Sequence, residues 1–216
     1  MREIITVSIG QCGNQVNEGF WDALATEHAI DHEKGLWDGK DYRQIEKSDV
    51  YFQEIPGGRY VPRSVLVDLE PGVLNAVQAN KKMGRLFNPD NFIGAQDGAG
   101  NNWAKGYLGY GSEIIDDVLD QVRKQTEICD SLSGFQIMHS LGGGTGSGLG
   151  SLVLEKLSED YSDSLRFNFS ILPGSTNGGV SDVVTEPYNS VLALNPLIEY
   201  SQAVFPIENK ALHRIC

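Results

Sequence analysis

Cysteine and basic residues are both scarce in this chain of 216 residues. The three cysteines, Cys12, Cys129 and Cys216, are too few and too scattered for a disulfide framework or a C-x-x-C zinc site. We therefore expect a reducing compartment, by default the cytosol. Lysine and arginine number 17 against 29 acidic residues, which gives a net charge of −12. Because a nucleic-acid partner favours a basic face, this balance predicts a small molecule or a protein as the partner.

Long apolar runs and linkers are missing as well. No apolar stretch approaches the roughly 20 residues of a membrane span, and the apolar run that ends at Ile9 is too short for a signal peptide. No internal repeat, low-complexity tract or Pro/Gly/Ser-rich linker divides the chain. We therefore expect residues 1–216 to form one soluble domain that binds neither membrane nor nucleic acid.

The most informative segment that is present spans residues 142–148, where five of seven residues are glycine. An apolar run of strand length, residues 135–138, precedes it, and apolar residues at helical spacing follow from Leu149. A glycine loop between a strand and a helix can bring backbone N–H groups close to an anion, and the helix N-terminus adds about half a positive charge. The segment therefore predicts a phosphate-binding loop.

The glycine loop matches neither of two common phosphate-binding motifs. It lacks the lysine of G-x-x-x-x-G-K-[ST], and its glycines do not fall in the G-x-G-x-x-G register. Taken alone, the segment could also be a plain connection between a strand and a helix.

Segments of strand length alternate with segments of helical periodicity along the whole chain. Strands are expected at residues 4–9, 64–67, near 92, and at 135–139, 165–172 and 203–207, with helices between them. Residues 31–58 are polar, without a sustained period, and predict a long loop-like excursion. The alternation predicts an α/β fold, a parallel sheet with helices on both faces. Ligands bind such sheets beyond the carboxyl ends of the strands, where the unusual loops lie.

Five segments, in this order along the chain, resemble the tubulin family: residues 10–15, 67–71, 98–104, 142–148 and 186–189. The resemblance runs from Met1 to Cys216 and implies a Rossmann-like nucleotide-binding domain. The opening residues 1–4 resemble β- and γ-tubulin. Residues 146–150, the excursion around 37–51 and residues 175–179 are more similar to a minor tubulin of the γ, δ, ε or ζ kind.

The resemblance implies a site for GTP or GDP with Mg²⁺, built from the loops that follow successive strands. Gln11 and Cys12 are implied to contact the diphosphate and base region, and Asn101 to sense the γ-phosphate. The phosphate loop itself is implied to consist of Ser140, Gly143, Gly144, Thr145 and Gly146. Cys12 taken alone could be an inert packed thiol.

The acidic and base-reading residues are implied in the same way. Asp68 and Glu70 resemble the acidic loop near the γ-phosphate and Mg²⁺, a cation that needs one or two carboxylates. Asp182 and Glu186 resemble the ribose-facing acids, and Asn209 resembles a guanine-recognising amide. Without the resemblance, Asp68 and Glu70 would be solvated acids of a Pro-Gly turn, and Asp182 a helix cap.

In the tubulin family the nucleotide is hydrolysed when a neighbouring subunit docks. The sequence stops before the region where the family places its central core helix, so we expect a truncated domain that hydrolyses GTP poorly alone. The implied partners are other tubulin subunits and centriolar or microtubule-associated proteins, in the cytoplasmic cytoskeleton. Two function classes stay open: a GTP-regulated subunit that assembles longitudinally into microtubule or centriolar structures, and a non-polymerising structural protein of centrioles or basal bodies.

Overall fold

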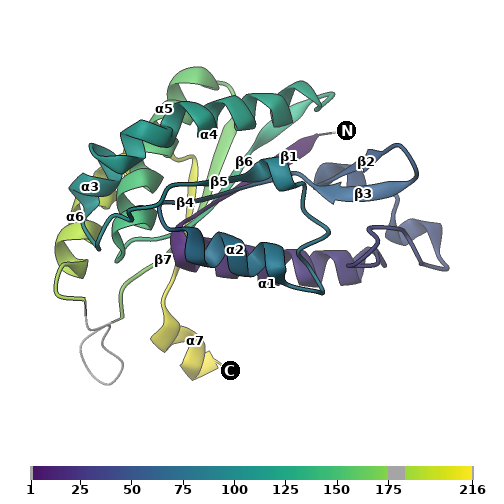
Figure 1. Ribbon diagram of the computed structural model, residues 1–216, viewed down its shortest axis with the longest axis horizontal. Coiled ribbons are helices and arrows are strands. Elements are labelled where there is room, and N and C mark those ends of the chain that lie inside the picture. Colours follow the sequence, from purple (N-terminus) through teal and green to yellow (C-terminus); the bar gives the residue numbers. More distant parts are fainter. Residues whose placement is uncertain (1, 175–182, 216) are drawn as a thin grey trace.

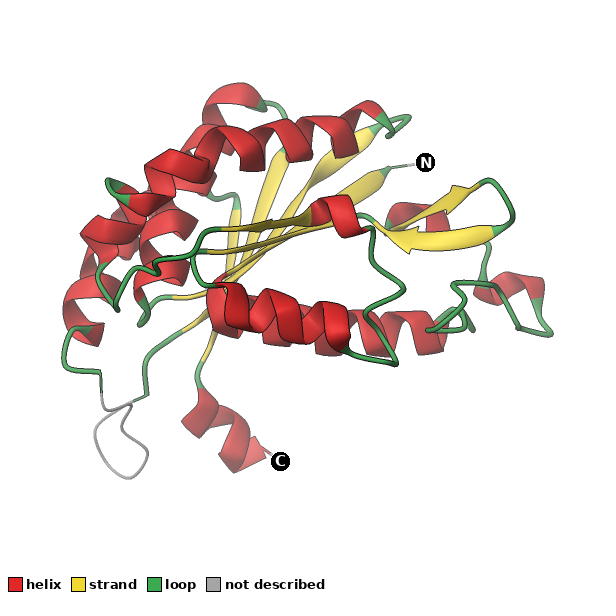
Figure 2. Cartoon of the chain, viewed as in Figure 1, coloured by secondary structure: helices red, strands yellow, loops and turns green. Residues whose placement is uncertain are grey.

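The computed structural model describes residues 2–174 and 183–215, and within them six parallel strands form one sheet (Figures 1 and 2). Their spatial order is β5-β4-β1-β6-β7-β8. The bounds are β1 Glu3–Ile9, β4 Ser64–Asp68, β5 Phe92–Gly94, β6 Leu132–Ser140, β7 Leu165–Ile171 and β8 Ala203–Ile207. The predicted parallel α/β sheet is confirmed.

The chain order reverses beside β1. From β1 the chain builds outward through β4 to β5, then returns to the other side of β1 and continues through β6, β7 and β8. Loops that leave neighbouring strands in opposite directions diverge at such a reversal, which opens a crevice beyond the carboxyl ends of the strands. The crevice beside β1 is therefore where this fold places a ligand.

Helices cover both faces of the sheet (Figure 1). One face carries α1 Gly10–Glu27 and α2 Pro71–Ala79, which contact each other and β4. The other carries α3 Trp103–Tyr107, α4 Tyr110–Glu127, α5 Gly150–Asp160 and α6 Glu186–Tyr200. The short α7 Asn209–Ile215 follows β8 and has no buried residue. Among the described residues, no helix has the length and apolar character needed to cross a bilayer.

The alternation of side chains along β1 creates two cores. Ile5, Val7 and Ile9 point into the core under α4 and α5, because side chains two residues apart share a face. On the opposite face Ser8 donates a hydrogen bond to Asn14 of α1 (Oγ to Oδ1, 2.7 Å). A second apolar core, centred on the fully buried Trp21, lies under α1 and α2. Burial on both faces fixes β1 at the centre of the molecule.

The predicted excursion at residues 31–58 is more ordered than expected. It contains the 3₁₀ turns Tyr42–Gln44 and Ser48–Val50, and it leads into an antiparallel hairpin of β2 Phe52–Ile55 and β3 Arg59–Pro62 (Figure 1). Gly57 and Gly58 form the tip with φ of +99° and +73°. The hairpin is anchored because Phe52 is fully buried with its ring centroid 5.1 Å from that of Trp21. The expectation of a loop-like excursion is therefore wrong at β2 and at the two 3₁₀ turns.

Candidate functional site

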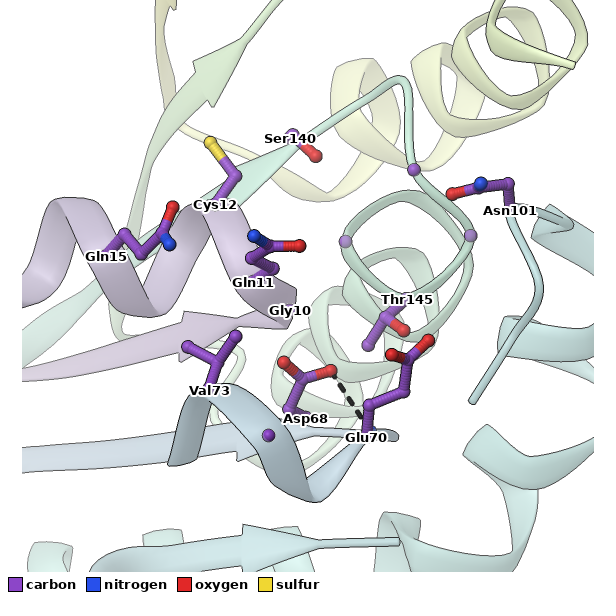
Figure 3. Close-up of a pocket in the computed structure, with 14 residues that line it drawn as sticks. Gly10, Gln11, Cys12, Gln15, Asp68, Glu70, Val73, Asn101, Ser140 and Thr145 are labelled. Atoms are coloured by element: carbon purple, nitrogen blue, oxygen red, sulfur yellow. Dashed lines mark hydrogen bonds between the residues drawn. The ribbon is translucent and has the colours of Figure 1, made fainter. Parts of the chain in front are cut away.

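A cavity of about 410 Å³ lies at the carboxyl ends of β1, β4 and β6 (Figure 3). Its walls come from four separate stretches of the chain. The lining residues are Gly10, Gln11, Cys12, Gln15, Asp68, Glu70, Gly72, Val73, Asn101, Ser140, Gly143, Gly144, Thr145 and Gly146. The sequence predicted ten of these as site residues, so the fold brings together groups that lie up to 135 positions apart, from Gln11 to Gly146.

The first wall is the start of α1. This helix begins at Gly10 itself, directly after β1. Gly10 has φ of +76°, and a Cβ there would lie 3.1 Å from the backbone N of Gly146. In the described structure no side chain caps this helix start and its first turn holds no acidic residue. The free N–H groups and the positive end of the helix dipole therefore favour an anion in the cavity.

Asn14 holds the start of α1 in place. Its buried amide donates from Nδ2 to Gly10 O (3.0 Å) and to Val67 O (2.9 Å). Gln11 and Gln15, one helical turn apart, both project to the cavity side, where Figure 3 shows them beside Cys12. Gln15 was not predicted as a site residue, although its i+4 spacing from Gln11 was visible in the sequence. Burial raises the pKa of the Cys12 thiol, which favours its neutral form.

The second wall is the glycine segment after β6. The predicted loop is largely a widened helical turn, because Thr145–Leu149 is a π-helix that continues directly into α5. Glycine is required where this turn packs against neighbouring backbone: a Cβ on Gly144 would lie 2.5 Å from the backbone N of Asn102. The side chain of Ser147 donates a hydrogen bond to the carbonyl of Gly143. As at α1, the first turn carries no acidic residue and none of its described neighbours caps it with a side chain.

The third wall carries the acids of the β4–α2 connection. Asp68 ends β4 and is only 3% exposed, whereas Glu70 is exposed at the rim. Burial raises the pKa of Asp68 to about 6, and the backbone N–H of Glu70, 3.3 Å from Oδ1, offsets the increase only in part. The reading of Asp68 as a solvated turn acid is therefore wrong. A buried carboxyl that faces a cavity is suited to a cation.

The fourth wall is the asparagine loop before α3. Asn101 lines the cavity with φ of +53°, a left-handed conformation that asparagine tolerates better than most residues. Asn102 caps α3, since its Oδ1 accepts from Ala104 N at 2.9 Å. The amide of Asn189 on α6 donates from Nδ2 to Asn101 O (2.9 Å) and to Gly142 O (2.8 Å). Asn189 was not predicted as a site residue, yet it joins the asparagine loop to the glycine turn.

Comparison with known proteins agrees with this geometry. The family model for the Tubulin/FtsZ family GTPase domain matches residues 3–216. The chain belongs to this family. It is 50% identical, over all of its 216 residues, to the tubulin beta chains of the Guillardia theta nucleomorph, Pneumocystis carinii and Porphyra purpurea. It spans about half the length of these relatives, namely 48%, 48% and 46%. Whether it is one of the minor tubulins stays a prediction.

Membership in the tubulin family implies guanine-nucleotide binding, and the cavity has the chemistry that such a ligand needs. Two uncapped helix starts offer N–H groups to phosphate, and Asp68 and Glu70 offer carboxylates to a cation (Figure 3). No group of three or more His, Cys, Asp or Glu side chains that could hold a metal occurs within residues 2–174 and 183–215. The carboxylates of Asp68 and Glu70 would suit a cation such as Mg²⁺, which needs one or two protein carboxylates and keeps other oxygen ligands.

Two predicted residues of the tubulin-type site, Glu186 and Asn209, are described by the structure and do not line this cavity. Glu186 begins α6 beside the glycine turn, where a Cβ on Gly142 would lie 2.9 Å from its Oε1. Asn209 is exposed at the first position of α7. Asp182 lies outside the described residues. The residues predicted to contact phosphate and cation thus lie around one cavity, and all the predicted nucleotide contacts stay predictions.

Proposed function

We propose that the cavity binds GTP or GDP, with the phosphates between the start of α1 and the turn Thr145–Leu149. The observation that carries the proposal is that these two uncapped helix starts meet in a single cavity, where the Cβ-free Gly10 lets the backbones approach closely. Backbone N–H groups bond phosphate without a lysine, each contact being worth about 1.5–3 kcal/mol. The missing lysine of the common motif is therefore no obstacle.

We propose that Mg²⁺ accompanies the nucleotide. Asp68 and Glu70 would hold the cation, directly or through water, and the cation would neutralise charge on the phosphates. Guanine and ribose contacts are proposed for Asn209, Glu186 and Asp182 on the strength of the family resemblance. Among the described cavity residues, Asp68 and Glu70 supply the carboxylates, and both are assigned to the cation, so we propose slow hydrolysis by the chain alone.

We propose that the chain acts within a cytoskeletal subunit that assembles with other tubulin subunits in the cytoplasm. The name tubulin beta chain carried by its relatives supports this, and the nucleotide would change loop conformation and so the affinity between subunits. Microtubule and centriolar structures, with their associated proteins, are the proposed settings. A non-polymerising role at centrioles or basal bodies is the alternative, and sedimentation of the chain with GTP or GDP separates the two.

The first test is to identify any nucleotide that copurifies with the chain, by mass spectrometry and chromatography. After the nucleotide is removed, titration calorimetry should show GTP binding at least about tenfold more tightly than ATP. EDTA should weaken GTP binding in the parent chain and much less in an Asp68→Asn variant. Equal affinity for GTP and ATP, or binding that EDTA leaves unchanged, would contradict the proposal.

A further inference from the structure

The widened turn Thr145–Leu149 leaves one carbonyl without its usual helical partner. In a regular α-helix the N–H of Gly150 would bond the carbonyl of Gly146, four residues earlier. Here that N–H bonds the carbonyls of Thr145 and Ser147 instead. The carbonyl of Gly146, a residue that lines the cavity, therefore has to find a donor elsewhere.

The imidazole of His139 supplies that donor. His139 lies near the carboxyl end of β6, is only 2% exposed, and places Nδ1 2.8 Å from Gly146 O. The ring reaches this carbonyl because Gly150 has no side chain: a Cβ there would lie 2.9 Å from Nδ1. The imidazole of His139 and the bare backbone of Gly150 thus pack closely together beneath the turn.

The second ring nitrogen ties His139 to the next strand. Nε2 lies 2.9 Å from Oγ of Ser170 on β7. A carbonyl can only accept, so the proton of the neutral ring sits on Nδ1 and Nε2 accepts from the serine hydroxyl. Burial lowers the pKa of His139, which agrees with a neutral ring of fixed tautomer.

The contact reaches the cavity through one planar peptide group. The carbonyl that His139 bonds belongs to the same peptide unit as the N–H of Ser147, and this N–H points the opposite way, to Gly143 O at 3.3 Å. Orienting the unit at one end therefore orients it at the other. Gly143 and Gly146 both line the cavity, so the bond sets the spacing of two phosphate-facing residues.

We propose that His139 is a positioning residue of the phosphate-binding turn, acting through its Nδ1–H bond to Gly146. This inference rests on the nucleotide-binding function proposed above. It assigns the two ring nitrogens separate tasks: Nδ1 shapes the turn that receives phosphate, whereas Nε2 anchors the ring to β7. Substitutions that retain one nitrogen at a time can separate these tasks.

Asparagine and glutamine provide that pair of substitutions. His139→Asn keeps an N–H donor near the position of Nδ1 and loses the contact to Ser170, whereas His139→Gln keeps a polar group near Nε2 and loses the bond to Gly146. The probes are GDP and, as a ligand without phosphate, guanosine, with affinities measured by calorimetry or competition. Thermal unfolding of both variants and of a Ser170→Ala variant reports the purely structural effect.

We expect His139→Gln to weaken GDP binding at least about tenfold, while His139→Asn and Ser170→Ala stay within about threefold of the parent chain. Guanosine affinity should change in none of them. Equal GDP affinities of the Asn and Gln variants, at equal thermal stability, would overturn the inference, as would a parallel loss of guanosine binding. If the parent chain binds no GDP, the proposed function fails and this inference fails with it.

Discussion

Replacing Asp68 by asparagine should stabilise the ligand-free chain at neutral pH. Asp68 is 3% exposed, and burial raises its pKa from 3.8 to about 6. Each pKa unit corresponds to about 1.4 kcal/mol of difference between the two protonation states, so the charged form destabilises the folded state by at most about 3 kcal/mol. Asparagine keeps the Oδ1 that accepts from the Glu70 N–H and carries no charge.

The sign of the pH dependence follows from the same pKa shift. The folded chain binds the proton of Asp68 more tightly than the unfolded chain, so this group lowers the free energy of unfolding as pH rises. The loss begins near the unfolded pKa of 3.8 and is complete above the folded pKa of about 6. The advantage of Asp68→Asn should therefore grow from about 0.5 kcal/mol at pH 4 to about 3 kcal/mol at pH 7.

Urea unfolding of nucleotide-free protein, followed by tryptophan fluorescence between pH 4 and pH 7, measures this difference. Glu70→Gln is the matched control, because it removes a charge from the same cavity at an exposed position and should change stability by less than about 0.5 kcal/mol. If the Asp68→Asn advantage is the same at pH 4 and pH 7, the carboxyl is not desolvated and the reasoning is refuted.

Three further substitutions probe the frame of the site and the core. Gly144→Ala places a Cβ 2.5 Å from a backbone nitrogen of the asparagine loop, so calorimetry should show at least about tenfold weaker GDP binding; unchanged affinity would contradict the packing. Asn189→Ala removes buried hydrogen bonds and should lower the free energy of unfolding in urea by about 2–4 kcal/mol. As the control, Asn195→Ala changes an exposed residue of the same helix and should lower that free energy by less than about 0.5 kcal/mol. Phe135→Ala, at a fully buried position, should lower the free energy of unfolding by about 3–5 kcal/mol in the same assay. The control is Phe205→Ala, at a position that is 47% exposed. A loss for Phe135→Ala no greater than that of the control would show that the core is placed wrongly.

The sheet could be predicted from the sequence because its strands are buried on both faces. The strands are short apolar runs between glycine-rich segments, with residues such as Ile5, Val7, Phe135 and Ile137. This pattern can be read directly from the sequence. The hairpin that ends at Pro62 was missed because its strands have four residues each and depend on burying Phe52 under α1. The sequence Pro56-Gly57-Gly58 gave a local signal of its turn, but not of the strands on either side.

The cavity residues could be predicted because each follows a strand, and parallel strands end at one edge. The groups that hold those residues could not. Asn189 bonds a carbonyl 88 positions away. His139 bonds the carbonyl of Gly146, which lacks its usual helical partner because the turn Thr145–Leu149 is π-helical rather than a loop. Neither contact has a spacing that sequence periodicity records, since both depend on the folded backbone.

The cavity combines two features that are each unfavourable in the ligand-free chain. The starts of α1 and of the turn Thr145–Leu149 direct uncapped N–H groups into it, and Asp68 is buried within it as an acid whose charge the surroundings disfavour. An anion alone would satisfy the helix starts but would raise the pKa of Asp68 further, whereas a cation alone would favour its charged form and be repelled by the helix dipoles. A phosphate group that carries its own divalent cation would satisfy both, so the arrangement of charges supports the proposal that the magnesium complex of a nucleotide binds here in preference to either ion by itself.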